Sequence, residues 1–372
     1  MKKRRIVIAS VLKPVNDTRA FEKMASTLAA HGGEVFLIGQ PTKNSYSGNL
    51  RIHFLPLKKF NRLSFSRLVA PIKIGLKIYQ VKPELLIVNT HELLIVAVLN
   101  RIFFGTPIIY DIQENYWRNI LLTNSFPHLL RPLLAGWVRL KEKLTSPLFH
   151  HFIFAEKSYE KEIGFVYSKY TVIENKVLLP PRFTRLPDPE KKVLLFSGTL
   201  AESTGVFRAI EFAKKLHAID PKIELLIIGF CAVKNTLEEI KSAVQNHPFI
   251  TLRGGNELVP HPEILDAISA ANFGIVSYPL SPHIADKIPT KLYEYLGCGL
   301  PILLQNHKPW MDFCQPFGGA LSFDFAAYEP AEIVTQLKSQ HFNSVDSSAS
   351  FQLTWQSEET KFLEAINQPI QI

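Results

Sequence analysis

Short apolar runs alternate with segments of helical spacing through the first half of the chain. Residues 18–31 and 93–101 repeat their apolar positions at the spacing of a helix face. Strands that alternate with helices in this way predict a Rossmann-like domain built on a parallel sheet. The apolar runs expected to be its strands lie at residues 5–10, 34–39, 85–89, 107–110 and 151–155.

The same alternation restarts after a stretch rich in proline and charge, at 178–192, which has neither a helical nor a strand period. Strands are expected at 193–197, 223–229, 250–252 and 273–277, and helices at 205–217, 237–244 and 262–270. We therefore predict two Rossmann-like domains. The expected parts are a first domain at 1–178, a linker at 179–190, a second domain at 191–354 and a C-terminal helix at 355–372.

Composition fits two ordinary globular domains. The chain has 372 residues, of which 47% are hydrophobic and 20% charged. The cysteines Cys231, Cys298 and Cys314 have no spacing that indicates a disulfide framework or a zinc site. The basic start at 1–10 fits a first strand better than a signal peptide, and polar residues interrupt the apolar region 85–104. These features predict a cytoplasmic protein without a spanning helix.

The net charge of +9 is concentrated in the first half. Two segments, 58–79 and 126–144, combine Lys and Arg with apolar residues at helical spacing, and the first includes Arg62. Such segments can lie on an anionic leaflet, which predicts peripheral association with the inner face of the membrane. The alternative is that each segment buries its apolar stripe in the core. No nucleic-acid-binding module is apparent.

The segment 287–304 joins a helix start, an acidic residue and a glycine turn. Pro289 favours the first turn of a helix, so a helix is expected to open near Pro289 or Thr290, to carry Glu294, and to end at Gly297 and Gly299. Asp286 then lies in the preceding loop. Lys287 and Lys291 flank the helix N-terminus, where free N–H groups and the helix dipole favour a phosphate.

This segment resembles the donor-site motif of family 4-type glycosyltransferases of the GT-B fold (glycosyl transferases group 1). In that motif an acidic residue, seven others and a glutamate precede a Cys- or Ala-Gly-x-Pro turn. Glu294, Cys298, Gly299 and Pro301 match it, and Asp286 stands where the first glutamate usually is.

The resemblance extends over nearly the whole chain and implies two Rossmann-like domains that face a cleft. It implies that the first, at 1–178, binds the acceptor, that the second, at 191–354, binds the donor, and that the C-terminal helix crosses back to the first domain. It implies that Glu294 binds the ribose hydroxyls and that Asp286 reaches the transferred sugar. It also implies transfer with retention, without a metal and without a cofactor other than the nucleoside diphosphate sugar donor.

A second group of donor residues is expected near the start of the second domain. Gly198 follows a predicted strand and would let a phosphate approach the backbone, with Thr199 as a hydrogen-bond donor. Thr199 and Thr204 occupy positions where the resembled family carries an arginine and a lysine. Arg253, Lys287 and Lys291 are therefore expected to bind the phosphates in place of that arginine and lysine.

Polar residues also follow the predicted strands of the first half. Asp17 or Thr18 can cap the first helix, from which Arg19 is expected to project and hold an acceptor phosphate. His91, Asp111 and Glu114 each follow a strand. A histidine with a near-neutral pKa suits removal of a proton from a sugar hydroxyl, so His91 and Asp111 are catalytic candidates and Glu114 an acceptor-binding candidate; a structural role for His91 stays open.

These features together predict a hexosyl-type glycosyltransferase that moves a sugar from a nucleoside diphosphate sugar to an acceptor. The basic first half suggests a membrane lipid-linked glycan in cell-surface polysaccharide or lipopolysaccharide synthesis. Three alternatives stay open: a GT-B type nucleotide-sugar epimerase, a non-catalytic membrane-associated GT-B subunit, and a glycoside hydrolase with a carboxylate pair.

Overall fold

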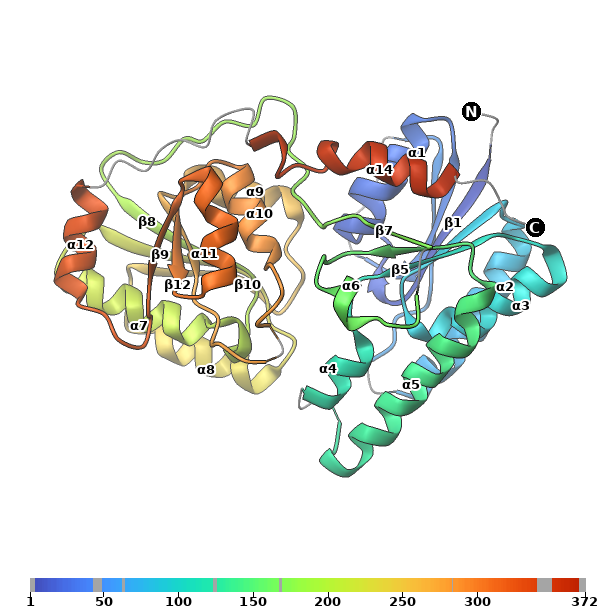
Figure 1. The fold of residues 1–372 in the computed structure, drawn as a ribbon. Helices are drawn as coiled ribbons and strands as arrows, with labels where there is room; N and C mark the ends of the chain where they lie inside the picture. The colour runs from blue at the N-terminus through green and yellow to red at the C-terminus, as the bar shows by residue number, and fades with distance from the viewer. Residues whose placement is uncertain are drawn as a thin grey trace. The chain divides into compact units, whose positions relative to one another are not determined.

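The computed structural model describes residues 4–42, 49–61, 64–122, 126–166, 169–282, 284–339 and 350–367. The chain forms two compact units (Figure 1). Unit 1 comprises Met1–Asn175 and Glu358–Ile372, and unit 2 comprises Lys176–Ser357. Arg62, which the sequence places in the first basic segment, lies outside the described residues.

Unit 1 is built on a seven-stranded sheet in the order β3-β2-β1-β4-β5-β6-β7. All neighbouring strands run parallel. The strand order reverses between β1 and β4, which is where open α/β sheets bind ligands at their carboxyl ends. The strands are β1 (Arg5–Pro14), β2 (Glu34–Gln40), β3 (Ile52–Pro56), β4 (Leu85–Val88), β5 (Ile108–Ile112), β6 (His151–Phe154) and β7 (Tyr170–Val172).

Helices cover this sheet. One part of its core packs Ala70, Ile74 and Ile78 of α2 and Leu94 and Ala97 of α3 against the strands. The helical elements of the unit are η1 (Thr18–Ala25), α1 (Ser26–Ala30), α2 (Phe65–Val81), η2 (His91–Leu93), α3 (Leu94–Phe104), α4 (Tyr116–Leu122), η3 (His128–Leu130), α5 (Arg131–Thr145), η4 (Ser146–Leu148), α6 (Tyr159–Glu162) and α14 (Gln356–Asn367).

The C-terminal helix α14 is part of unit 1, far along the chain from its neighbours there (Figure 1). Thr27 donates a hydrogen bond to Glu359 at 2.9 Å, and the backbone N–H of Glu174 donates to Glu358 at 3.3 Å. The buried side chains of Phe362 and Ile366 add apolar contact. The last helix therefore completes the domain in which the chain begins.

Unit 2 repeats the doubly wound arrangement with a six-stranded parallel sheet in the order β10-β9-β8-β11-β12-β13. Its strands are β8 (Lys192–Thr199), β9 (Ile223–Phe230), β10 (Ile250–Gly255), β11 (Phe273–Val276), β12 (Ile302–Gln305) and β13 (Ala320–Phe323). Its helical elements are η5 (Glu202–Thr204), α7 (Val206–His217), α8 (Lys234–Val244), α9 (His261–Ala270), α10 (Thr290–Gly297), α11 (Lys308–Cys314), η6 (Gln315–Phe317) and α12 (Pro330–Ser339).

The predicted α/β architecture of two Rossmann-like units is confirmed by these two sheets. The strands β3, β7, β12 and β13 were not predicted. All three cysteines are buried free thiols. Within the described ranges, none of the helices is long and apolar enough to cross a bilayer.

The two basic amphipathic segments of unit 1 do not bury their apolar stripes, which excludes the alternative that these stripes form core. In α2 the buried positions are Ala70, Ile74 and Ile78, and the larger apolar side chains lie on the opposite, solvent side. The exposed apolar residues of α2 are Phe65, Leu68, Ile72, Leu76 and Tyr79, and those of the second segment include Leu129, Leu130, Leu133, Trp137 and Leu140.

Candidate active site

Helix α10 begins at Thr290, as the sequence predicted, and Pro289 precedes it with φ −56° and ψ 135°. Gly299 ends the turn after the helix with φ +69°, a conformation that glycine adopts without strain. Asp286 is exposed in the turn before the helix, and Glu294 lies on the helix, half-buried. The predicted placement of the two carboxylates, one in a loop and one on a helix, is confirmed.

Glu294 has a basic neighbour that the sequence did not reveal. Its Oε1 lies 3.4 Å from Nε2 of His261, the first residue of α9, and the two side chains are mostly buried. The charge of Glu294 also reaches the phenol of Tyr278, where burial is the main cause of a raised pKa. Glu294 thus has one ion-pair neighbour, His261, and its charge acts on Tyr278 from a different element.

The burial of Lys291 was not expected for a side chain predicted to bind a phosphate. Only 5% of it is exposed, and its Nζ has no hydrogen-bond partner among the described residues. Instead, Nζ lies 3.8 Å from the ring centroid of Phe196 and 5.4 Å from that of Tyr278. Burial lowers the pKa of Lys291 to about 7, although the charge of Glu294 acts to raise it.

Gly198 brings the end of strand β8 next to this lysine. Its φ is +92°, and a Cβ at this position would lie 3.4 Å from Cε of Lys291. Gly198, Lys291 and Glu294 therefore share one side of unit 2, at the carboxyl end of β8 and on helix α10. Carboxyl ends of parallel strands are the usual place for a ligand in such sheets.

The loop after β8 satisfies its own polar groups. The hydroxyl of Thr204 accepts a hydrogen bond from the backbone N–H of Ala201 and lies 2.8 Å from the carbonyl oxygen of Thr199. Gly205 follows with φ +83°, and a Cβ there would meet the carbonyl oxygen of Ser277 at 2.1 Å. This close approach places the N-terminus of α7 beside the end of β11. Thr199, at the end of β8, is exposed to solvent.

The other expected phosphate-binding cations lie farther from this group. Arg253 is exposed on β10, which is separated from β8 by β9. Lys287 is half-buried in the loop before α10, and its backbone carbonyl accepts a hydrogen bond of 2.7 Å from the indole N–H of Trp310. Burial lowers the pKa of His307 beside the same indole, and the charge of Asp286 acts in the opposite direction.

In unit 1, Arg19 does not project toward solvent, which corrects the expectation from its place on the first helical turn. Its Nη2 donates to Asp111 at 2.8 Å and its Nε donates to the same carboxylate at 3.1 Å. Both side chains are almost completely buried. The cap is confirmed, because Asp17 accepts from the backbone N–H of Ala20 at 3.0 Å. Asp111 is therefore the partner of Arg19 and is not free to act as a base.

His91 is also different from the expected near-neutral base. Its pKa is lowered to about 4, mainly by burial; the charge of Glu92 acts to raise it, and the charges of Lys141 and Arg67 act to lower it. Its Nδ1 lies 3.1 Å from Nζ of Lys141. An imidazole with this pKa is a weak base at neutral pH, so the expected catalytic role lacks its chemical basis. Glu114 is exposed and accepts a hydrogen bond from Asn119 at 2.9 Å.

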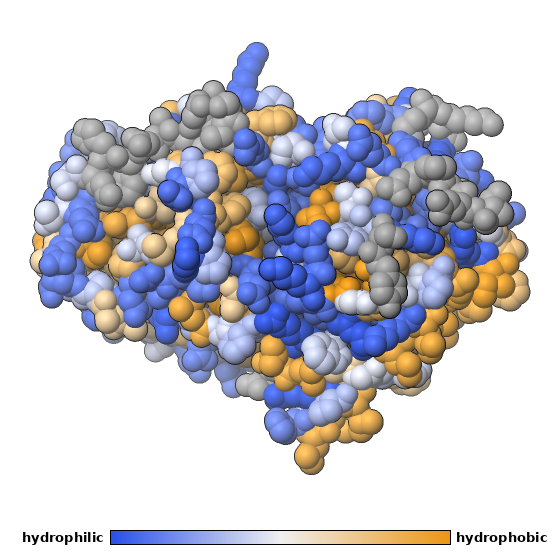
Figure 2. Space-filling view, viewed as in Figure 1, coloured by the Kyte–Doolittle hydropathy of each residue, from blue (hydrophilic) through white to orange (hydrophobic). Residues whose placement is uncertain are grey.

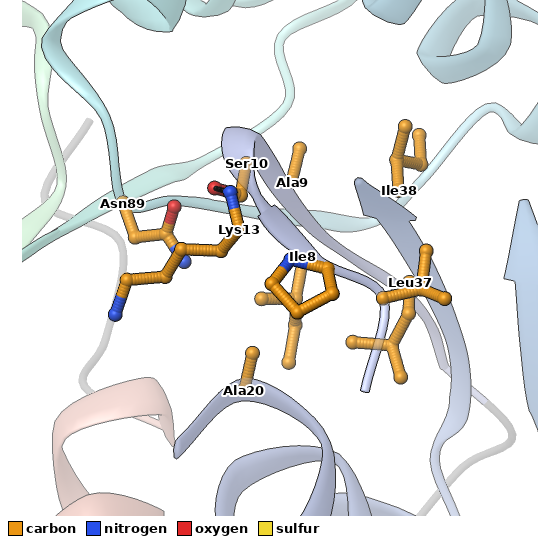
Figure 3. Close-up of a pocket in the computed structure, with 10 residues that line it drawn as sticks. Ile8, Ala9, Ser10, Lys13, Ala20, Leu37, Ile38 and Asn89 are labelled. Atoms are coloured by element: carbon orange, nitrogen blue, oxygen red, sulfur yellow. Dashed lines mark hydrogen bonds between the residues drawn. The ribbon is translucent and has the colours of Figure 1, made fainter. Parts of the chain in front are cut away.

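A small cavity of about 10 Å³ lies at the carboxyl end of β1 (Figure 3). Ser10, Lys13 and Asn89 line its polar side. Neither amide atom of the buried Asn89 has a hydrogen-bond partner among the described residues. A space of this size holds about one water, and an amide with a free donor and a free acceptor suits a water or a single hydroxyl.

The sequence singled out Glu294, Gly198 and Lys291, which the structure brings together, but not the residues around them. Phe196 lies within strand β8, Tyr278 comes two residues after the end of β11, and His261 is the first residue of α9. A rule that examines every side chain just after a strand would have marked Tyr278. Within the described residues, no group of three or more His, Cys, Asp or Glu side chains is arranged to hold a metal ion.

No protein-family model and no curated protein matches the sequence. Solved structures, however, match it over almost its full length. Sucrose-phosphate synthase from Thermosynechococcus elongatus is 13% identical with a TM-score of 0.71, and the match covers 98% of this chain and 99% of that one. Anabaena HepE in complex with UDP-glucose is 12% identical with a TM-score of 0.66, covering 98% and 100%.

WaaG, a glycosyltransferase involved in lipopolysaccharide biosynthesis, is 11% identical with a TM-score of 0.63, and the match covers 98% of this chain and 96% of that one. These identities are low, and the likeness is one of fold. It extends through both units, so the chain has the GT-B fold, as the sequence predicted.

Proposed function

We propose that this protein is a glycosyltransferase that takes a sugar from a nucleoside diphosphate sugar. The observation that carries the proposal is the grouping of Gly198, Lys291 and Glu294 in unit 2. The glycine lets a phosphate approach the backbone, the lysine supplies a cation, and the glutamate supplies a carboxylate. A diphosphate and a ribose need these three kinds of partner. The shared fold with a protein solved in complex with UDP-glucose supports it.

The residues of the proposed donor site have the following roles. Glu294 binds the ribose hydroxyls, and Asp286 reaches the sugar that is transferred. The free N–H groups at the starts of α7 and α10 face the diphosphate together with Lys291, while Lys287 and Arg253 add longer-range positive charge. As the diphosphate leaves, it gains negative charge, which these groups stabilise. We propose that transfer proceeds with retention and without a metal.

We further propose that unit 1 docks on an anionic membrane and that the acceptor is lipid-linked. The support is a continuous apolar face on three neighbouring helices, α2, α3 and α5 (Figure 2). The residues of this apolar face are Phe65, Leu68, Ile72, Leu76, Tyr79, Ile95, Leu99, Ile102, Phe103, Phe104, Leu133, Trp137, Leu140 and Leu144.

The exposed charges on the three helices that form the apolar face are all positive. Helices α2 and α3 contain no acidic residue, and the one acid of α5, Glu142, is buried. Lys73 and Lys143 are exposed among the apolar side chains. An apolar face on helices that expose basic and no acidic side chains complements an anionic leaflet, where each nearby Lys or Arg contributes about 1 kcal/mol. A glycan carried on a membrane lipid in cell-surface polysaccharide or lipopolysaccharide synthesis fits this surface.

A transfer assay tests the proposal. The protein is incubated with radiolabelled UDP-, GDP-, dTDP- or ADP-sugars and a bacterial lipid extract, and label in the organic phase is counted. Label in lipid that is lost in Glu294→Ala is the expected result. Conversion of the donor sugar without any acceptor would instead indicate an epimerase. Absence of binding and of turnover with every donor would indicate a non-catalytic subunit.

A further inference from the structure

The surroundings of Lys291 are unusual for a side chain expected to meet a diphosphate. The lysine lies against the faces of Phe196 and Tyr278, and its Nζ has no hydrogen-bond partner among the described residues. A buried ammonium without a partner loses its hydration and gains little in return. Contacts of the ammonium with ring faces offset only part of the free energy lost with its hydration. The free protein therefore holds this nitrogen where the neutral amine is favoured.

The groups that face Lys291 come from three elements. Strand β8 contributes Phe196 and Gly198, neither of which carries a charge. The segment after β11 contributes Tyr278, whose raised pKa keeps the phenol neutral. Helix α10 itself contributes Glu294, the one carboxylate whose charge favours the ammonium. Burial outweighs this single charge, because the pKa of Lys291 falls to about 7 from its ordinary value of 10.5.

A bound diphosphate would reverse this balance. Gly198 and the N-terminus of α10 mark the place where the phosphates would lie, and Cε of Lys291 is adjacent to Gly198. Two negative charges at that place would favour the ammonium far more than Glu294 alone does. We propose that Lys291 is largely neutral in the free protein at slightly alkaline pH and takes up a proton when the donor diphosphate binds, so that donor binding is coupled to proton uptake.

This inference rests on the proposed function, since it needs a donor at this site. The pH dependence follows from linkage. Below pH 7 the lysine is already charged and the affinity for the donor is independent of its protonation. Above pH 7 each unit of pH lowers the affinity by up to about tenfold, because one proton must be bound together with the donor.

Isothermal titration calorimetry measures the coupling. An intact nucleotide sugar such as UDP-glucose is the right probe, because its diphosphate lacks the terminal phosphate ionisation near pH 6 that free UDP has. Titration at pH 8 in buffers with different ionisation enthalpies gives the number of protons taken up. We expect close to one proton for the wild type. Binding with fewer than about 0.2 protons would overturn the inference and leave the donor site intact.

Three variants identify the group that is protonated. Lys291→Met removes the amine at similar volume and should abolish proton uptake, and Lys291→Arg, which is permanently charged, should bind the donor without uptake. Lys308→Met, a lysine whose side chain is 84% exposed on α11, should keep the wild-type uptake. Uptake that persists in Lys291→Met would overturn the assignment and point to His261. If UDP-, GDP-, dTDP- and ADP-sugars all fail to bind, the proposed function fails, and the inference fails with it.

Discussion

Oε1 of Glu294 lies 3.4 Å from Nε2 of His261, which ties the acidic residue of α10 to the first residue of α9. Glu294 is the proposed ribose ligand, and His261 lies within ion-pair distance of its carboxylate. A carboxylate that is already oriented loses less entropy when it binds a ligand. If the donor binds at Glu294, His261 is expected to help position this carboxylate.

Replacing His261 by Ala should weaken nucleotide-sugar binding about 3- to 10-fold without unfolding the protein, because one partner of a partly exposed pair is worth about 1 kcal/mol. Calorimetry against the wild type measures the loss. His261→Asn keeps a polar side chain at this position and should recover part of the affinity. Equal affinity in wild type and His261→Ala would mean that Glu294 does not need this neighbour.

The buried pair of Arg19 and Asp111 should be a stability element of unit 1. Its charges lie 2.8 Å apart with almost no exposure, so Arg19→Ala would leave an uncompensated buried carboxylate. We expect a loss of about 3–5 kcal/mol in the free energy of unfolding, measured by urea denaturation. The double variant Arg19→Met/Asp111→Leu removes both charges and should recover most of the loss. A double variant as unstable as the single one would argue against the pair as the cause.

The buried Lys291 also predicts how the stability of the ligand-free protein depends on pH. Its pKa is lower in the folded state, about 7, than the ordinary 10.5 that holds in the unfolded chain. Between these values the unfolded state binds more protons, so this residue makes stability rise with pH from about 7 upward. The cost of burying the charged form is greatest at and below pH 7, on the order of 2–5 kcal/mol.

Lys291→Met should therefore be more stable than the wild type at pH 6, and the difference should shrink as the pH rises to 9. Urea denaturation of both proteins across this range gives the comparison, in which the contributions of all other groups cancel. A difference that does not change with pH would show that Lys291 keeps an ordinary pKa in the folded protein.

The apolar face of unit 1 predicts vesicle binding that depends on individual side chains. Leu133 and Trp137 of α5 are 73% and 57% exposed. The double variant Leu133→Glu/Trp137→Glu should reduce sedimentation with vesicles of anionic phospholipid at least tenfold, because each apolar side chain contributes about 1.5–3 kcal/mol when it leaves water.

Ile219→Glu provides the matched control, since Ile219 is 47% exposed but lies in unit 2. It should sediment like the wild type. Vesicles of neutral lipid should bind the wild-type protein more weakly than anionic ones. Equal sedimentation of the three proteins would remove the basis for membrane docking through α5.

Strands β1, β4, β6 and β8 were predictable from sequence because each contains a run of three or four consecutive apolar residues that is largely buried. The edge strands β3 and β13 were not, since they are only partly buried and show no such run. Helix α2 shows a different limit. Its spacing predicted a helix, but the face toward the sheet is the one with Ala70, Ile74 and Ile78, and sequence alone left open whether its larger apolar side chains face solvent.

The site was predictable where its residues are close in sequence. Glu294 and Lys291 share one helix with a recognisable start, and that helix is in place. The partners of these residues come from elsewhere in the chain: Phe196 is on β8 and His261 opens α9. Arg19 and Asp111, 92 residues apart, could not be paired without the order of the strands. The burial of this pair, like the burial that lowers the pKa of His91, could not be read from the sequence.

Binding of nucleotide sugars to the wild type and to Glu294→Ala tests the donor site most directly. Thermal unfolding is followed with UDP-, GDP-, dTDP- and ADP-sugars well above their Kd, where 100 times Kd adds about 2.7 kcal/mol of stability. Glu364→Ala, a glutamate on α14 of unit 1, serves as the control. We predict that one donor raises the Tm of the wild type and of Glu364→Ala but not that of Glu294→Ala. An equal rise in all three proteins, or no rise with any donor, would contradict a nucleotide-sugar site at α10.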